Sequence, residues 1–229
     1  MFKETLLKEF NIFVDEKQLQ AFEDYFHLLV ETNEKMNLTA ITEKQEVYIK
    51  HFYDSLTIID QIPKGAHILD MGSGAGFPSI PIKILRSDVK VTIVDALNKR
   101  IRFLEELTKK LRLMDVFLYH DRAEKFALMH QKKFDVVTAR AFGVLPLILE
   151  LGIPTLKEKG LFLAMKGQNY KEELENAQST LKVLCAKIDG IKELTLPNDY
   201  GDRAIITIIK EKHINGYPRD YQKILKKPL

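Results

Sequence analysis

Apolar and polar positions divide the chain into an amino-terminal helical part and a longer part in which apolar runs alternate with amphipathic segments. In the first part, large apolar residues recur at helical spacing: Leu19, Phe22, Phe26 and Leu29. The pair Asp15 and Gln18 predicts a capping box at the start of that helix. A polar stretch follows, and Thr42 with Gln45 predicts a second helix that runs into residues 51–56.

From residue 66 onward, seven apolar runs rich in β-branched residues predict strands: 66–71, 90–95, 115–119, 134–139, 160–165, 188–196 and 203–210. Helical segments separate the first six: 78–86, 97–112, 123–130, 144–156 and 170–186. This alternation is typical of a largely parallel sheet with helices on both faces. Turn residues at 197–202 instead predict an antiparallel hairpin at the end.

These patterns predict an α/β protein with a Rossmann-like, seven-stranded and mostly parallel sheet, whose carboxyl-terminal hairpin strand is antiparallel. We expect three parts. Residues 1–60 form a helical extension, residues 61–212 form the sheet domain, and residues 213–229 form a basic tail.

The stretch 70–78, Asp-Met-Gly-Ser-Gly-Ala-Gly-Phe-Pro, follows the first predicted strand and precedes a predicted helix. Alternate glycines allow a tight turn and let a ligand approach the backbone, as in nucleotide sites. Asp95 closes the next strand and suits both hydroxyls of a ribose. The spacing G-x-G-x-G favours S-adenosylmethionine (SAM) over NAD, whose fingerprint is G-x-G-x-x-G, and Asp70 suits the cations of SAM. NAD binding stays open as an alternative.

Polar residues follow five of the predicted parallel strands, at the glycine stretch, Asp95, 121–124, 138–141 and 166–168. Because ligands bind beyond the carboxyl ends of such strands, we expect these ends to converge on one crevice. Arg140 and Lys166 lie in two of these ends. We expect them to position substrate or cofactor rather than to act as acids or bases.

The net charge of +3 is unevenly distributed. Residues 1–60 carry 6 basic and 12 acidic residues, and residues 61–229 carry 29 basic and 20 acidic residues. The basic surplus indicates either phosphate contacts or an ordinary solvated surface. The lone Cys185 lies in a predicted helix and excludes an internal disulfide. Lacking a membrane-span pattern and metal-ligand spacing, the sequence predicts a cytoplasmic, metal-free protein, which we expect to be a monomer.

Several motifs together resemble the 16S ribosomal RNA (guanine-N7)-methyltransferase family, called RsmG or GidB. They are Asn33 with 37–39, His51 with 54–56, 70–78, 99–100 with 103–104, 122–124, 135–141, 166–167, 217–219 and 226–229. The resemblance implies methyl transfer from SAM to N7 of a guanosine in the 530 loop of 16S rRNA, with rRNA or the small ribosomal subunit as partner. Three substitutions depart from the family pattern: Thr32 for tryptophan, and Ser79 and Asp121 for glycines.

The sequence patterns and the resemblance together give the candidate site residues, with Asp95 coming from its place after the second strand and the other SAM-site residues matching family positions. The SAM-site candidates are Gly72, Gly74, Phe77, Asp95, Ala123, Glu124 and Arg140. The substrate-side candidates are His51, Asp54, Lys99, Arg100 and Arg219. N7 of guanine carries a lone pair and no proton, so its methylation needs positioning rather than a base. A SAM-dependent methyltransferase of small molecules and a non-catalytic SAM-binding module remain the alternatives.

Overall fold

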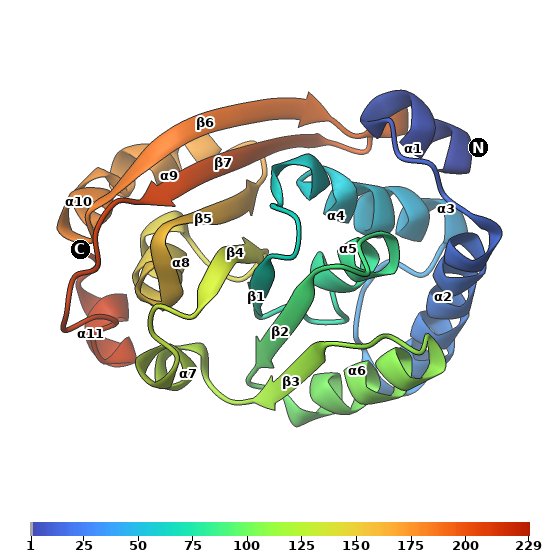
Figure 1. Ribbon diagram of the computed structural model, residues 1–229, viewed down its shortest axis with the longest axis horizontal. Coiled ribbons are helices and arrows are strands. Elements are labelled where there is room, and N and C mark those ends of the chain that lie inside the picture. The colour runs from blue at the N-terminus through green and yellow to red at the C-terminus, as the bar shows by residue number, and fades with distance from the viewer. Residues whose placement is uncertain (1) are drawn as a thin grey trace.

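A computed structural model describes residues 2–229. It contains seven strands: β1 (His67–Met71), β2 (Lys90–Asp95), β3 (Val116–His120), β4 (Phe134–Arg140), β5 (Leu156–Lys166), β6 (Ala186–Thr195) and β7 (Asp202–Lys210). They form one sheet in the order β3-β2-β1-β4-β5-β7-β6 (Figure 1). Strands β1 to β5 pair in parallel, whereas β7 is antiparallel to both β5 and β6. The predicted α/β class, the seven strands and the terminal hairpin are confirmed.

Helices cover both faces of the sheet (Figure 1). One face carries α1 (Phe2–Phe10), α2 (Glu16–Met36), α3 (Lys44–Glu46), the π-helix η1 (Val47–Tyr53), α4 (Asp54–Leu56), η2 (Ile59–Gln61), α5 (Ser79–Leu85) and α6 (Asn98–Lys110). The other carries α7 (Ala123–Met129), α8 (Leu145–Gly152), η3 (Ile153–Thr155), α9 (Tyr170–Asn176), α10 (Gln178–Val183) and α11 (Tyr221–Lys226). The hairpin turn holds η4 (Pro197–Asp199).

Alternation along the strands produces the two cores. Ile68 of β1 belongs to the apolar cluster beneath α2, α5 and α6, whereas its neighbour Leu69 belongs to the cluster beneath α7 and α8. Phe22 and Phe52, from the amino-terminal helices, are fully buried in the same cluster as Ile68. The helical extension therefore packs directly on the sheet and shares its core.

The amino-terminal helices match the sequence prediction in part. Helix α2 begins with the predicted capping box, in which Asp15 and Gln18 each accept a backbone N–H from the other at 2.8 and 3.1 Å. The second helix begins later than predicted, at Lys44, because the Glu43 side chain caps it by accepting the Gln45 N–H. Thr42 lies outside the helix.

Three other predicted boundaries are wrong. Helix α8 ends at Gly152, and β5 already begins at Leu156 because the exposed charged residues 157–159 lie within that strand. The predicted helix 170–186 is divided into α9 and α10 at Ala177. Cys185 lies after α10 with a φ of 48° and is only partly buried, so it is not a helical core residue. The short helix α11 within the basic tail was not predicted.

Candidate functional site

The glycine loop joins β1 to α5 at the centre of the sheet, where the strand order reverses direction. Gly72, Gly74 and Gly76 adopt φ angles of 69°, 63° and 102°, in the left-handed region that favours glycine. A Cβ on Gly76 would lie 2.8 Å from the Tyr25 hydroxyl, so this position also requires a small residue. A Cβ on Gly74 would meet nothing within 4 Å, which leaves the middle of the loop open to a ligand.

Asp95, at the end of β2, fixes the loop from one side. Its carboxylate is 3% exposed and accepts the backbone N–H of Gly74 at 3.3 Å and that of Leu97 at 2.9 Å. The Arg100 guanidinium donates to the same carboxylate at 3.1 Å. The structure therefore places Arg100 beside the carboxylate expected to bind a ribose.

Asp70 lies fully buried beneath the loop. One carboxylate oxygen accepts the Ser79 N–H at 3.2 Å, and the other has no partner within residues 2–229. Burial raises the pKa of Asp70 to about 7. The Ser73 hydroxyl, within the glycine loop, is likewise buried without a partner there. These unpaired polar atoms beside an open loop fit a ligand that brings cationic or hydrogen-bonding groups.

Two adjoining hollows lie at the carboxyl ends of the strands. The first, of about 300 Å³, is formed by the glycine loop together with Thr39, Arg100 and Phe142. The second, of about 610 Å³, extends past Asp54 to Lys166. They share three lining residues: His51, Arg140 and Ala141. Residues of η1 and α4 thus close a crevice that begins at the sheet.

His51 separates the two hollows and is held on three sides. The His51 ring stacks on the Phe77 ring with centroids 4.5 Å apart, and the Arg140 guanidinium lies over the Phe77 ring, 5.0 Å from its centroid. Arg140 donates to His51 Nδ1 at 3.4 Å, so Nε2 carries the proton and donates to Thr39 Oγ1 at 2.9 Å. Burial, with help from the Arg140 cation, lowers the pKa of His51 to about 3. His51 is therefore neutral near pH 7.

A buried carboxylate organises the cations of the second hollow. Asp54 is 2% exposed and accepts from Arg140 at 3.0 Å and from Arg203 at 3.1 Å. Lys166 donates to the Gly143 carbonyl at 2.6 Å and pairs with Glu173 at 2.6 Å. Each cation in this group is therefore oriented by a protein acceptor.

Sequence reasoning missed Arg203 and Glu173. Arg203 lies near the start of β7. Because that strand runs antiparallel, its beginning lies at the edge where β4 and β5 end. The predicted hairpin contained this signal. Glu173 lies on α9, and only the fold brings it to Lys166.

The structure brings together eight of the predicted site residues: Gly72, Gly74, Phe77, His51, Asp54, Arg100, Arg140 and Lys166. It leaves others outside the two hollows. Asp95 lines neither, although it contacts Gly74 and Arg100 of the first hollow. Lys99 donates to the Met36 carbonyl at 2.6 Å, and Arg219 forms a two-point ion pair with the buried Glu150 at 2.7 Å. Ala123 and Glu124 lie at the start of α7, where Glu124 pairs with Arg122.

Two further properties bear on the site. Within residues 2–229, no group of three or more His, Cys, Asp or Glu side chains is arranged to hold a metal ion. None of the helices described combines the length and the apolar composition of a membrane span.

Comparison with known proteins identifies the family. The family model described as GidB, rRNA small subunit methyltransferase G, matches residues 18–200. The chain belongs to this family. Ribosomal RNA small subunit methyltransferase G of Ligilactobacillus salivarius is 47% identical over 222 residues, which cover 93% of this chain and 92% of the relative. The Halalkalibacterium halodurans protein of the same name is 48% identical, over 97% of this chain and 96% of the relative.

Solved structures agree on the fold of this methyltransferase G family member. Crystalline M. jannaschii TYW2 in complex with AdoMet aligns with a TM-score of 0.60 and 14% identity, over 76% of this chain and 80% of that chain. A SAM-dependent methyltransferase from Aquifex aeolicus aligns with a TM-score of 0.58 and 18% identity, over 79% and 98%. At such identities the likeness shows the fold alone, which is the Rossmann-like α/β fold predicted from the sequence.

Proposed function

We propose that this protein transfers a methyl group from SAM to N7 of a guanosine in the 530 loop of 16S rRNA. One observation supports this reaction most directly. The crevice joins an open glycine loop to a hollow in which the lining cations and His51 are already held by protein partners. Such a crevice suits a reaction that needs orientation and no proton removal.

SAM, when bound, supplies a methyl group activated by its sulfonium. Gly72, Gly74 and Phe77 would hold it along the loop, with Asp95 on the ribose. The unpaired oxygen of Asp70 and the open space at Gly74 fit such a ligand. Ala123 and Glu124, which the family resemblance sets beside the adenine, lie beyond β3.

The second hollow then receives the guanine. The N7 lone pair would form a bond to the methyl group of SAM as the sulfur–methyl bond breaks and S-adenosylhomocysteine leaves, so no proton has to be removed. His51 is unsuited to act as a base because its Nδ1 already accepts from Arg140. Arg140 and Lys166 position the nucleotide or its phosphates, while Asp54 fixes the direction of Arg140.

RNA is the substrate class that best fits the charge. The surplus of basic over acidic residues lies wholly in residues 61–229. The cationic side chains that line the two hollows also lie there, with the exception of Lys50. Phosphate contacts supply affinity and register, while the hollow selects the base. Cytoplasmic location and a monomeric state remain our expectations.

A methyl-transfer assay tests the proposal. Radiolabelled SAM is incubated with the protein and with small subunits from cells that lack this gene, and 7-methylguanosine is mapped along the 16S rRNA. We expect one modified guanosine in the 530 loop, and no incorporation into subunits that are already methylated. Label at another position would refute the assigned target.

Two further outcomes favour the alternatives. SAM binding without transfer to any rRNA would favour a non-catalytic SAM-binding module. Transfer to a small molecule, with an affinity that does not depend on salt, would favour a small-molecule methyltransferase.

A further inference from the structure

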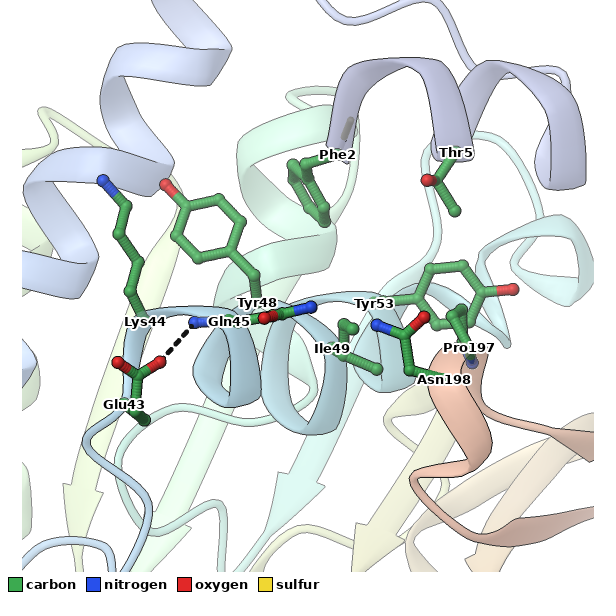
Figure 2. A pocket seen from close by; sticks show the side chains of 10 residues that line it. All are labelled: Phe2, Thr5, Glu43, Lys44, Gln45, Tyr48, Ile49, Tyr53, Pro197 and Asn198. Atoms are coloured by element: carbon green, nitrogen blue, oxygen red, sulfur yellow. Dashed lines mark hydrogen bonds between the residues drawn. The ribbon is translucent and has the colours of Figure 1, made fainter.

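A third cavity, of about 460 Å³, lies between α1, η1 and the β6–β7 hairpin turn (Figure 2). Tyr48, Ile49 and Tyr53 of η1 line it, whereas His51 of the same helix lines the catalytic hollows. The π-helix therefore has this cavity on one side and the crevice on the other. The volume is within the range of small-molecule sites, about 300–1,000 Å³.

The walls of the cavity are mostly apolar and aromatic. Phe2 of α1 meets the Tyr48 ring of η1 edge to face at one wall, with the ring centroids 5.0 Å apart (Figure 2). Of the two charged side chains that line the cavity, Lys44 pairs with Glu23 at 2.5 Å and Glu43 accepts the Gln45 backbone N–H at 3.2 Å. The Tyr48 hydroxyl donates to Glu23 at 2.8 Å. This interior suits a neutral ligand rather than a phosphate or another ion.

Two side-chain amides supply polarity without charge. In Figure 2 the Gln45 side chain extends along η1 between Tyr48 and Ile49, and the Asn198 amide points from the hairpin toward Ile49 and Tyr53. Both residues are solvent-exposed, and within residues 2–229 neither side-chain amide has a protein hydrogen-bond partner, so both are accessible to a ligand at the mouth of the cavity. Asn198 is held at a φ of 60° by the turn, which fixes its position at the cavity mouth. Each amide offers both a donor and an acceptor.

We propose that this cavity binds a nucleobase, supplied either by a free nucleoside or by an unpaired base of the rRNA. A base is planar and neutral, and its edge carries donors and acceptors side by side. Aromatic walls with convergent amides match both properties, since unpaired RNA bases are recognised by stacking and by hydrogen bonds to their edges. An occupant would contact η1 directly and so stabilise the helix that carries His51.

The first experiment uses free nucleosides. Adenosine or guanosine is titrated into the protein, saturated with S-adenosylhomocysteine to block the cofactor site, while the Ile49 methyl resonance and the binding heat are recorded. We expect the Ile49 signal to shift. Removing both amides in Gln45→Ala/Asn198→Gly should weaken binding about threefold to tenfold for each amide lost. Glycine at 198 keeps the left-handed turn, and Gln20→Ala on α2 is the matched control that removes an amide outside the cavity.

The second experiment distinguishes the two sources of the base. Binding of unmethylated small subunits is compared between the wild type, the double variant and Gln20→Ala. Weaker subunit binding by the double variant, without nucleoside binding, assigns the cavity to an rRNA base. Nucleoside binding that depends on both amides, with unchanged subunit affinity, assigns it to a free nucleoside. If neither ligand distinguishes the double variant from the control, the proposal is wrong. The wild-type methyl-transfer assay tests the proposed function separately.

Discussion

The substitution Asp54→Asn tests whether one buried carboxylate organises the cations of the substrate hollow. Asparagine keeps the shape of the side chain and one acceptor oxygen, but it removes the charge shared by Arg140 and Arg203. The two guanidiniums lie 3.0 and 3.1 Å from the carboxylate and are 15% and 25% exposed. After the substitution they retain their charges beside each other without a counterion.

The expected loss follows from burial. Removing one partner of a fully buried ion pair costs about 3–5 kcal/mol. Because both arginines reach solvent in part, we reduce this to about 2–3 kcal/mol of unfolding free energy. A domain of ordinary stability, about 5–15 kcal/mol, still folds after such a loss. Arg140 loses its direction, so kcat/KM for methyl transfer should fall at least tenfold in the folded variant.

Urea unfolding and the methyl-transfer assay measure the two effects separately. Asp60→Asn is the matched control, because Asp60 pairs with Lys192 at 3.4 Å on the surface and is 58% exposed. Its loss should cost less than about 0.5 kcal/mol. Equal losses of stability in the two variants, or unchanged methyl transfer in Asp54→Asn, would refute the organising role of Asp54.

Three other substitutions test burial in and around the site. His51→Gln should remove a loss of stability in acid. The pKa of His51 is about 3 in the folded protein and 6.5 in the unfolded chain, so wild-type His51 contributes stability above pH 6.5 that is lost as the pH falls toward 3, by up to about 1.4 kcal/mol per pH unit. Urea unfolding at pH 5 and at pH 7 should therefore show a larger loss of stability on acidification in the wild type than in the variant. The pH dependence at Asp70 has the opposite sign, because the pKa of Asp70 is raised to about 7: its contribution to stability is full below pH 3.8 and is lost as the pH rises through 7. The unfolding free energy of Asp70→Asn should therefore gain about 3 kcal/mol relative to that of the wild type between pH 5 and 8. A difference in denaturant midpoint that stays constant over this range would contradict this. Arg219→Ala removes the guanidinium from the fully buried Glu150, which then keeps only the backbone N–H of residue 219, and it should cost about 3 kcal/mol of stability with kcat/KM within twofold of wild type. Lost activity at full stability would return Arg219 to the substrate side.

The sheet was predictable because the buried strands are short segments rich in apolar and β-branched residues, with amphipathic helical segments between the parallel ones. The hairpin was predictable because 197–202 contains only turn-forming chemistry. The start of β5 was not, since Lys157, Glu158 and Lys159 are exposed and carry no strand signal of their own. The register of β4 and β5 fixes that strand: Leu156 pairs with Phe134, and a bulge separates this pair from the remainder.

The part of the candidate site that is formed by a local sequence motif was predictable. The part that is assembled by tertiary packing was not. The glycine loop and Asp95 follow from spacing along two adjacent strands. The arrangement around Asp54 depends instead on residues 54, 140 and 203, which lie on a helix and on two strands that do not neighbour each other in the sheet. No local pattern records that the same carboxylate meets both arginines.

The two sides of the crevice come from different parts of the fold. The glycine loop and Asp95 belong to the sheet, and solved structures of 14–18% identity share that sheet fold. His51 and Asp54 belong to η1 and α4, which are part of the helical extension and pack on the sheet through Phe52. These two residues set the direction of Arg140, the cation that lines both hollows. Selectivity for the substrate should therefore depend on how the extension packs, and core substitutions at Phe52 should reduce methyl transfer more than they reduce SAM binding.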